Sequence, residues 1–315
     1  MRNKRPIIID CDPGQDDAVA ILLALAAPDE LEVLGITAVA GNVPLEKTQR
    51  NARIMCELAG KPEISVFAGC AEPLERPLFT AEYVHGREGI DGADIFEPTM
   101  PLQEQHAVDF IVETLMAAKD DSITLVPTAP LTNVASALLK EPKIAAKIHE
   151  IVLMGGAFRE GGNVTPSAEF NVYVDPQAAK IVFGCGRPIV AMGLDVTHQV
   201  LGTPARVNTI GDLGTKDARN VRGMLEFFNR HDVEKYGVEG GPLHDPCTIA
   251  YLLQPSLFHG KHVNVEVETD SELTIGETVV DFWRVTGREP NVNWIHTADA
   301  DGFFDLLTQR LGELG

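Results

Sequence analysis

Short runs of β-branched residues alternate along the chain with longer segments in which apolar residues recur at helical spacing. This alternation is typical of βα units that build a largely parallel sheet covered by helices. The pattern predicts strands at 6–9, 31–39, 64–67, 123–126, 150–153, 188–192 and 262–267. It predicts helices at 17–27, 45–59, 107–119, 131–140, 176–183, 219–235, 245–253 and 302–311. Because no repeat and no Pro- or Ser-rich linker interrupts the pattern, we expect a single domain over residues 1–315.

Two segments, 69–101 and 155–174, fit neither the strand period nor the helix period. The second is rich in Gly, Asn and single charges. Connections of this length without regular structure are usually functional or mobile when they occur inside a compact domain. We therefore expect both segments to form walls of a functional site.

The charge and the cysteines narrow the class of protein. The 315 residues include 46 acidic and 26 basic side chains, a formal charge of -20, which argues against nucleic acid or anionic membranes as partners because both need clustered Lys and Arg. The five cysteines form no CxxC pair and are odd in number, as expected for a reduced, cytoplasmic protein. The apolar runs at 7–9 and 18–27 are too short for a signal peptide or a membrane-spanning helix.

Four aspartates fall within eight residues directly after the first predicted strand: Asp10, Asp12, Asp16 and Asp17. Asp16 or Asp17 suits the start of the next helix, where a carboxylate caps free N–H groups. Capping does not account for Asp10 and Asp12, because crowded carboxylates raise one another's pKa unless a cation joins them. A cluster of oxygen ligands without His or Cys is typical of calcium or magnesium. The spacing is not that of an EF-hand, since Gln15 stands where that loop requires Gly.

Polar side chains also follow the other predicted strands. They include Asn42 after the second strand, Thr128 and Asn133 after the fourth, Asn163, Glu169 and Asn171 in the segment after the fifth, and His244 and Asp245 before a later helix. Ligands of open parallel sheets bind beyond the carboxyl ends of the strands, so these groups are expected to line one crevice. Carboxylates and amides in such a crevice are well suited to a polyhydroxyl ligand such as ribose.

In their order these motifs resemble the nucleoside hydrolases, the inosine-uridine-preferring ribohydrolase family. The resemblance covers nearly the whole chain and is carried by 10–17 (DCDPGQDD), 40–43 (AGNV), 126–133 (VPTAPLTN), 154–156 (MGG), 169–171 (EFN) and 244–246 (HDP). It implies an α/β fold, with an open, mostly parallel, mixed sheet flanked by helices around a Rossmann-like core, and a homotetramer or homodimer. The implied reaction is hydrolysis of the N-glycosidic bond of ribonucleosides to ribose and free base, in nucleoside salvage.

The resemblance also implies roles for individual residues. Calcium would be bound by Asp12, Asp17, the main-chain carbonyl of Thr128 and Asp245, and Asp12 would also be the general base. The substrate would be bound by Asp16, Asn42, Met154, Asn163, Glu169, Phe170 and Asn171. Negative groups around the sugar suit this chemistry, because the glycosidic bond breaks through a sugar cation.

The departing base must accept a proton or leave as an anion, and two histidines are candidate donors. His244 precedes the implied ligand Asp245 and is expected at the rim of the site. His85 lies in a Gly-rich segment typical of a mobile lid. Tyr236, eight residues before His244, is expected to reach the base. The resemblance implies pyrimidine or broad specificity. Pyrimidine-preferring members carry a similar Tyr with Gln four residues earlier, and this chain departs from them with Asp232, which argues against strict pyrimidine preference and keeps a broad or purine-tolerant specificity open.

Two alternatives stay open from the residues alone. A strand that ends in Asp-x-Asp is also typical of magnesium-dependent phosphatases, with Asp10 as the nucleophile, although Gly14 stands where such enzymes usually carry Thr or Val. A non-catalytic protein that binds ribose or nucleosides would need the same polar residues. The glycine-rich dinucleotide motif, the P-loop, the serine-hydrolase elbow and the HExxH zinc motif are absent from the sequence.

Overall fold

A nine-stranded sheet forms the centre of the computed structural model, which describes residues 4–237 and 239–314 except for the side chains of Asp232, Lys235 and Tyr236. The strands are β1 (Arg5–Cys11), β2 (Leu31–Ala38), β3 (Val66–Ala68), β4 (Ile123–Pro127), β5 (Ile148–Met154), β6 (Ile189–Met192), β7 (Phe258–Val267), β8 (Thr278–Asp281) and β9 (Val292–Ala298). Their order is β3-β2-β1-β4-β5-β6-β9-β7-β8. Pairing is parallel from β3 to β9 and antiparallel for β9–β7 and β7–β8. The predicted open, mostly parallel α/β sheet is confirmed.

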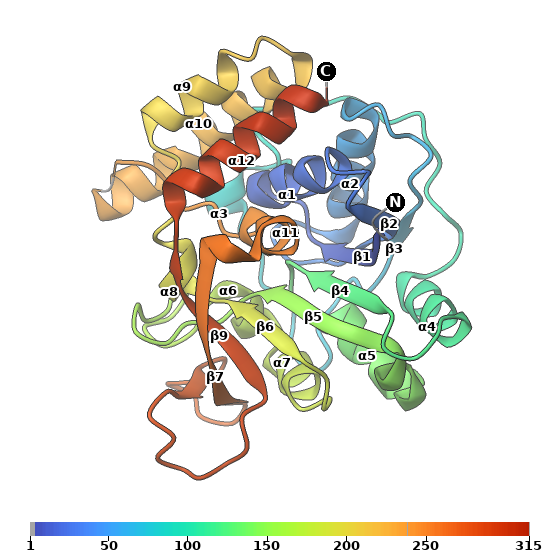
Figure 1. The fold of residues 1–315 in the computed structure, drawn as a ribbon, viewed down its shortest axis with the longest axis vertical. Coiled ribbons are helices and arrows are strands. Elements are labelled where there is room, and N and C mark those ends of the chain that lie inside the picture. The colour runs from blue at the N-terminus through green and yellow to red at the C-terminus, as the bar shows by residue number, and fades with distance from the viewer. Residues whose placement is uncertain (1–3, 238, 315) are drawn as a thin grey trace.

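Helices cover both faces of the sheet (Figure 1). They are α1 (Gln15–Leu25), α2 (Leu45–Leu58), α3 (Glu82–His85), α4 (Ala107–Ala117), α5 (Thr132–Lys140), α6 (Phe170–Val174), α7 (Pro176–Phe183), α8 (Leu194–Thr197), α9 (Pro204–Gly211), α10 (Lys216–Tyr236), α11 (Pro246–Leu253) and α12 (Ala300–Glu313), with short 3-10 helices η1 (Pro142–Lys147) and η2 (Pro255–Leu257). Helices α1, α2 and α9 to α12 lie on one side of the sheet, and α4, α5 and α7 lie on the other.

The central strand β1 shows why the sheet is buried on both faces. Ile7 and Ile9 belong to the core formed with α1, α2 and the C-terminal helices, whereas Ile8 belongs to the core around α4, α5 and α7. Successive side chains of a strand point to opposite faces, so a continuous apolar run is needed where helices pack on both. The apolar run ends at Asp10, near the carboxyl end of β1, where buried polar side chains begin.

Two strands and several short helices were not predicted. β9 inserts between β6 and β7, and its Trp294 is fully buried, while its partly polar sequence hides the strand period. β8 and the helices α3, α6 and α8 have only four or five residues, too few to show a period. α10 begins at Lys216, three residues before the predicted start, because the Thr215 side chain accepts a hydrogen bond from the N–H of Ala218.

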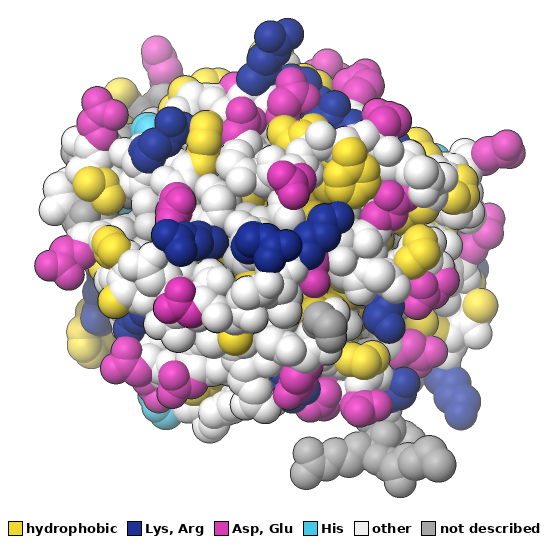
Figure 2. Space-filling view, turned by 90° about the horizontal axis from the view of Figure 1, so that it is seen from above, with side chains coloured by type: hydrophobic (Ala, Val, Ile, Leu, Met, Phe, Trp, Pro, Cys, Tyr) yellow, Lys and Arg dark blue, Asp and Glu magenta, His cyan; other side chains and the backbone are white. Residues whose placement is uncertain are grey.

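The surface carries charges of both signs. On the face seen in Figure 2, acidic side chains are spread over most of the surface, and some of the basic ones lie in a short row across its middle with acidic side chains above and below, so this face offers no broad positive area for a polyanion. Within 4–237 and 239–314, no helix has the length and apolar character needed to cross a membrane.

Candidate active site

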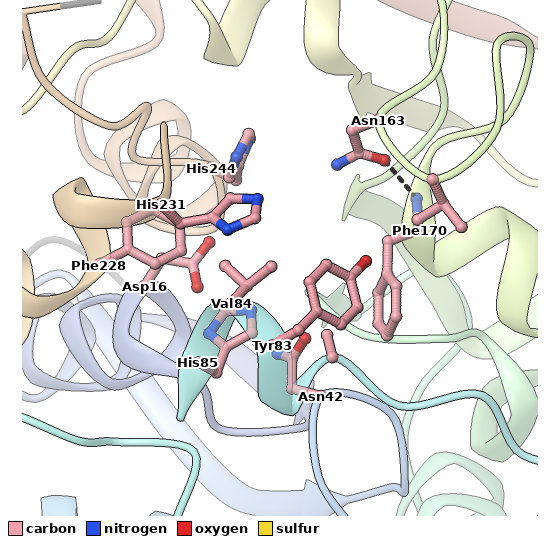
Figure 3. A pocket seen from close by; sticks show the side chains of 12 residues that line it. Asp16, Asn42, Tyr83, Val84, His85, Asn163, Phe170, Phe228, His231 and His244 are labelled. Carbon is pink, nitrogen blue, oxygen red and sulfur yellow. Dashed lines mark hydrogen bonds between the residues drawn. The ribbon is translucent and has the colours of Figure 1, made fainter. Parts of the chain in front are cut away.

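Two adjoining cavities at the carboxyl ends of the strands share lining residues and form one cleft, and Figure 3 shows one of the two. Residues that line both cavities are Asp16, Asn42, His85, Asn163 and His244. The polar half of the cleft adds Thr128, Met154, Glu169, Asn171 and Asp245. The aromatic half adds Ala81, Tyr83, Val84, Val164, Phe170, Phe228 and His231. Both long segments without clear period therefore supply walls of this cleft.

Four aspartates meet at the polar half. Asp16 and Asp245 line its wall, whereas Asp12 and Asp17 are fully buried beneath it. Asp16, Asp17 and Asp245 each place a carboxylate oxygen within 4.8 Å of the others, close enough for one cation to bind all three. Asp16 and Asp17 lie in the first turn of α1, and Asp245 directly precedes α11, so the fold brings together aspartates that are far apart in the sequence.

Burial makes this cluster electrostatically costly without a cation. Burial, and next the charge of Asp17, raise the pKa of Asp12 well above its usual range. Burial and then Asp16 raise the pKa of Asp17 to about 7, and the same two causes raise the pKa of Asp245. Oδ1 of Asp12 and Oδ1 of Asp16 are buried without a hydrogen-bond partner among the described residues. Asp16, Asp17 and Asp245 can therefore hold a metal ion. Asp16 was expected only as a substrate ligand, whereas Asp12, expected as a metal ligand, is not one of these three.

Asp12 is held in place by the turn that follows β2. Its Oδ2 accepts a hydrogen bond of 2.6 Å from the backbone N–H of Asn42. A Cβ atom at Gly41 would lie 2.0 Å from the same oxygen, so only glycine permits this close approach. Thr128, after β4, donates from Oγ1 to Oδ1 of Asp17 at 2.8 Å. The turns after β2 and β4, the two strands beside β1, thus orient the two buried aspartates.

The segment before α6 supplies amide and carboxylate groups. Glu169 accepts backbone hydrogen bonds of 2.9 Å from Gly156 and from Asn171, and burial raises the pKa of Glu169 to about 7. The Asn171 side chain donates to the carbonyls of Thr128 at 3.0 Å and Met154 at 3.2 Å. Oδ1 of Asn163 accepts from the N–H of Phe170 at 3.0 Å, which leaves the Asn163 amide nitrogen directed toward the cleft (Figure 3).

Two neutral histidines face the cleft. Burial, and next His198, lower the pKa of His244 well below its usual range, and Nδ1 of His244 lies 2.8 Å from Oγ1 of Thr197. Burial lowers the pKa of His85 to about 3, with a smaller contribution from His231. His244 and His85 are therefore neutral near pH 7, and each ring carries a single proton.

The aromatic half contains residues that the sequence analysis did not single out. Tyr83 and His231 lie edge to face with ring centroids 5.8 Å apart, and Phe228 lies 5.5 Å from His85. Phe228 and His231 are three residues apart on α10 and so share one helix face, which is the only sequence signal for them. The side chain of Tyr236, expected to reach the base, lies outside the described residues, as does that of Asp232.

Asp10 is not placed as a nucleophile. It is only 1% exposed, and its Oδ1 accepts hydrogen bonds from Thr37 at 2.6 Å and from Asn133 at 2.8 Å. Asp10 lies within β1 and does not line either half of the cleft. The geometry of Asp10 therefore argues against the phosphatase alternative.

Comparisons with known proteins point in one direction. Residues 7–305 match the family described as inosine-uridine preferring nucleoside hydrolase. The pyrimidine-specific ribonucleoside hydrolase RihA of Klebsiella pneumoniae is 48% identical over 97% of this chain and 98% of its own length. The structure of a purine-preferring ribonucleoside hydrolase from Gardnerella vaginalis matches with a TM-score of 0.91 and 34% identity, covering 98% of this chain and 99% of that chain. A plant nucleoside hydrolase matches with a TM-score of 0.91 and 33% identity over the same shares of both chains.

Proposed function

Because the chain belongs to the family of inosine-uridine preferring nucleoside hydrolases, and is thus an N-glycosyl hydrolase, we propose that it is a calcium-dependent enzyme that cleaves pyrimidine ribonucleosides to ribose and base. The observation that carries the proposal is the cleft itself, with a cluster of buried aspartates at one end and aromatic rings at the other. The first end suits a ribose and a cation, and the second suits a flat base. The 48% identity to a pyrimidine-specific enzyme, against 34% to a purine-preferring one, supports the choice of base.

Asp12, Asp17, Asp245 and the carbonyl of Thr128 would hold the calcium ion, with Asp16 beside them. The ion would supply the positive charge that keeps these carboxylates ionised and would fix two ribose hydroxyls in place. Asp16, Asn42, Met154, Asn163, Glu169, Phe170 and Asn171 would bind the rest of the nucleoside. Tyr236 would reach the base from the end of α10.

Asp12 is proposed as the general base. Its Oδ2 is engaged by the N–H of Asn42, whereas its buried Oδ1 has no partner among the described residues and can accept a proton. As the bond between C1′ and the base breaks, a water oxygen bonds to C1′ and passes a proton to Oδ1 of Asp12. The negative charges of the cluster stabilise the positive sugar that forms on the way.

His244 is proposed as the proton donor to the departing base. The hydroxyl of Thr197 is buried, and the Nδ1 atom of His244 is its hydrogen-bond partner. A buried donor without an acceptor costs about 1–3 kcal/mol, so the hydroxyl donates to Nδ1 rather than the reverse. Nε2 of His244 then carries the ring proton and passes it to the base nitrogen.

Three further parts of the proposal concern the metabolic role, the cellular compartment and the oligomeric state of the enzyme. We propose that it acts in nucleoside salvage, in the cytoplasm, and as a homotetramer or homodimer. The odd cysteine number supports the reducing compartment. Light scattering of the purified protein tests the assembly.

A panel of nucleosides tests the reaction directly. Uridine, cytidine, inosine and guanosine are incubated with the enzyme in calcium, and released ribose is measured as reducing sugar. We expect the highest kcat/KM for uridine or cytidine, and no ribose from the Asp12→Asn variant. Absence of ribose from every nucleoside in the wild-type reaction would remove the proposal, and a preference for inosine would remove only the choice of base.

A further inference from the structure

The side chain of Gln15, the first residue of α1, links the segment that carries His85 to the start of that helix. Nε2 of Gln15 donates to the carbonyls of His85 at 2.9 Å and of Asp91 at 3.1 Å, and Oε1 lies 2.8 Å from Nδ1 of His85. Only an NH₂ group can donate to two carbonyls at once, so these bonds determine which atom of the amide is the oxygen. The oxygen of Gln15 therefore faces the ring of His85.

The orientation of the amide determines where His85 carries its proton. Oε1 of Gln15 can only accept a hydrogen bond, so Nδ1 of His85 must be the donor. Because the ring is neutral, its other nitrogen, Nε2, has a free lone pair. His85 lines both halves of the cleft, and two close neighbours restrict its ring. A Cβ atom at Gly14 would lie 2.3 Å from Nδ1, and the Phe228 ring lies 5.5 Å away.

We propose that Gln15 is a positioning residue that holds His85 with its proton on Nδ1, so that Nε2 accepts a hydrogen bond from a ribose hydroxyl. In this arrangement His85 binds substrate and does not protonate the departing base. The inference rests on the proposed function and divides the two histidines of the cleft by role. Thr197 leaves His244 with a donor toward the cleft, whereas Gln15 leaves His85 with an acceptor.

The position of the proton can be measured without substrate. In protein labelled with ¹⁵N-histidine, we expect the His85 signals at pH 7 to show a protonated Nδ1 and an unprotonated Nε2, assigned through their loss in His85→Phe. Gln15→Leu should shift both signals toward a mixture of the two tautomers. Asn51→Leu is the matched control, because Asn51 ties the same segment through the carbonyls of Pro13 and Glu88 without touching the ring of His85.

Asn51→Leu should keep the wild-type pattern of the ring nitrogens. The proposal is overturned if wild-type His85 carries its proton on Nε2, or if Gln15→Leu leaves the pattern unchanged. It is also overturned if Asn51→Leu alters the pattern as much as Gln15→Leu does, because the effect would then come from loosening of the segment.

Kinetics test the role of Nε2. p-Nitrophenyl riboside has the same ribose hydroxyls as uridine, but its leaving group departs without a proton. His85→Phe should lower kcat/KM for both substrates by the same factor, within about twofold, whereas His244→Phe should affect uridine more strongly. A loss in His85→Phe that is confined to uridine overturns the proposal. If the wild-type protein hydrolyses neither substrate, the proposed function fails, while the ring-nitrogen signals still decide the tautomer.

Discussion

In the proposed mechanism, the position of the proton on His244 depends on the hydroxyl of Thr197, which lines neither half of the cleft. Thr197 is fully buried at the end of α8 and reaches Nδ1 of His244 across 47 positions of sequence. A valine at this position keeps the volume but removes the donor, so the imidazole is free to place its proton on Nδ1 instead. The buried hydroxyl is therefore expected to matter for catalysis in proportion to how much the leaving base needs a proton.

We expect Thr197→Val to lower kcat for uridine about tenfold and kcat for p-nitrophenyl riboside by less than about twofold. Thr197→Ser keeps the hydroxyl and should retain most of the activity on uridine. Steady-state kinetics of the three proteins on both substrates measure this. Equal slowing of the two substrates by Thr197→Val would mean that the hydroxyl has only a structural role.

Asp10 gives the stability of the protein a defined dependence on pH. Burial raises the pKa of Asp10 from 3.8 to about 7, and the hydrogen bonds from Thr37 and Asn133 only partly oppose this shift. A carboxyl whose pKa is raised in the folded state stabilises the fold fully below pH 4. That contribution is lost as the pH rises toward 7, because the unfolded chain ionises more easily.

Asp10→Asn should remove this part of the pH dependence. Relative to wild type, the free energy of unfolding of the variant should increase by about 2–4 kcal/mol between pH 4.5 and pH 8. Urea unfolding of both proteins in a chelating buffer measures the difference, since other titrating groups contribute to both alike. A constant difference across this pH range would show that Asp10 is ionised in the fold throughout.

At the scale of elements, the turn between β2 and α2 determines where Asp12 lies. A methyl group at Gly41 would meet Oδ2 of Asp12 at 2.0 Å and the Pro130 ring at 2.9 Å. We expect Gly41→Ala to lower kcat for uridine at least about a hundredfold, because displacement of a catalytic group by about 1 Å has effects of this size. Ribose release and thermal unfolding are measured together.

Gly312→Ala is the matched control for this substitution. Gly312 lies in α12, and the nearest atom to an added Cβ is a methyl of Leu213 at 3.6 Å, an ordinary contact. Gly312→Ala should leave turnover unchanged. It should raise the free energy of unfolding by up to about 1 kcal/mol, because alanine has a higher helix propensity than glycine. Normal turnover in Gly41→Ala would show that the turn can move away without displacing Asp12.

The elements that the sequence predicted are those whose own residues carry the signal. The run from Ile7 to Ile9 and the apolar period of α2 are local patterns, and they predicted β1 and α2 closely. β9 was missed because its place depends on pairing with β6 and β7 rather than on its own partly polar sequence. The partners of His85 and His244, Gln15 and Thr197, are separated from them by 70 and 47 positions. No local pattern contains such contacts, so only the folded chain reveals them.

At the scale of the whole molecule, buried aspartates and a formal charge of -20 act in the same direction. Both make the folded chain repel itself, and a divalent cation in the cleft would relieve the strongest part of this repulsion. A ligand that binds only the folded state stabilises it by RT ln(1 + [L]/Kd), which is about 2.7 kcal/mol at a hundred times Kd. Calcium is therefore expected to affect the stability of the protein as well as its activity.

We expect the melting temperature to rise by several degrees when calcium is added to chelator-treated protein. It should fall back to its starting value when chelator is added again. General screening of the negative charge would also stabilise the fold, so sodium chloride at matched ionic strength is the control and should have a smaller effect. Asp245→Asn removes one carboxylate of the cluster and should abolish the response to calcium while keeping the response to salt. If calcium and matched salt raise the melting temperature equally in the wild-type protein, the aspartate cluster holds no specific calcium ion.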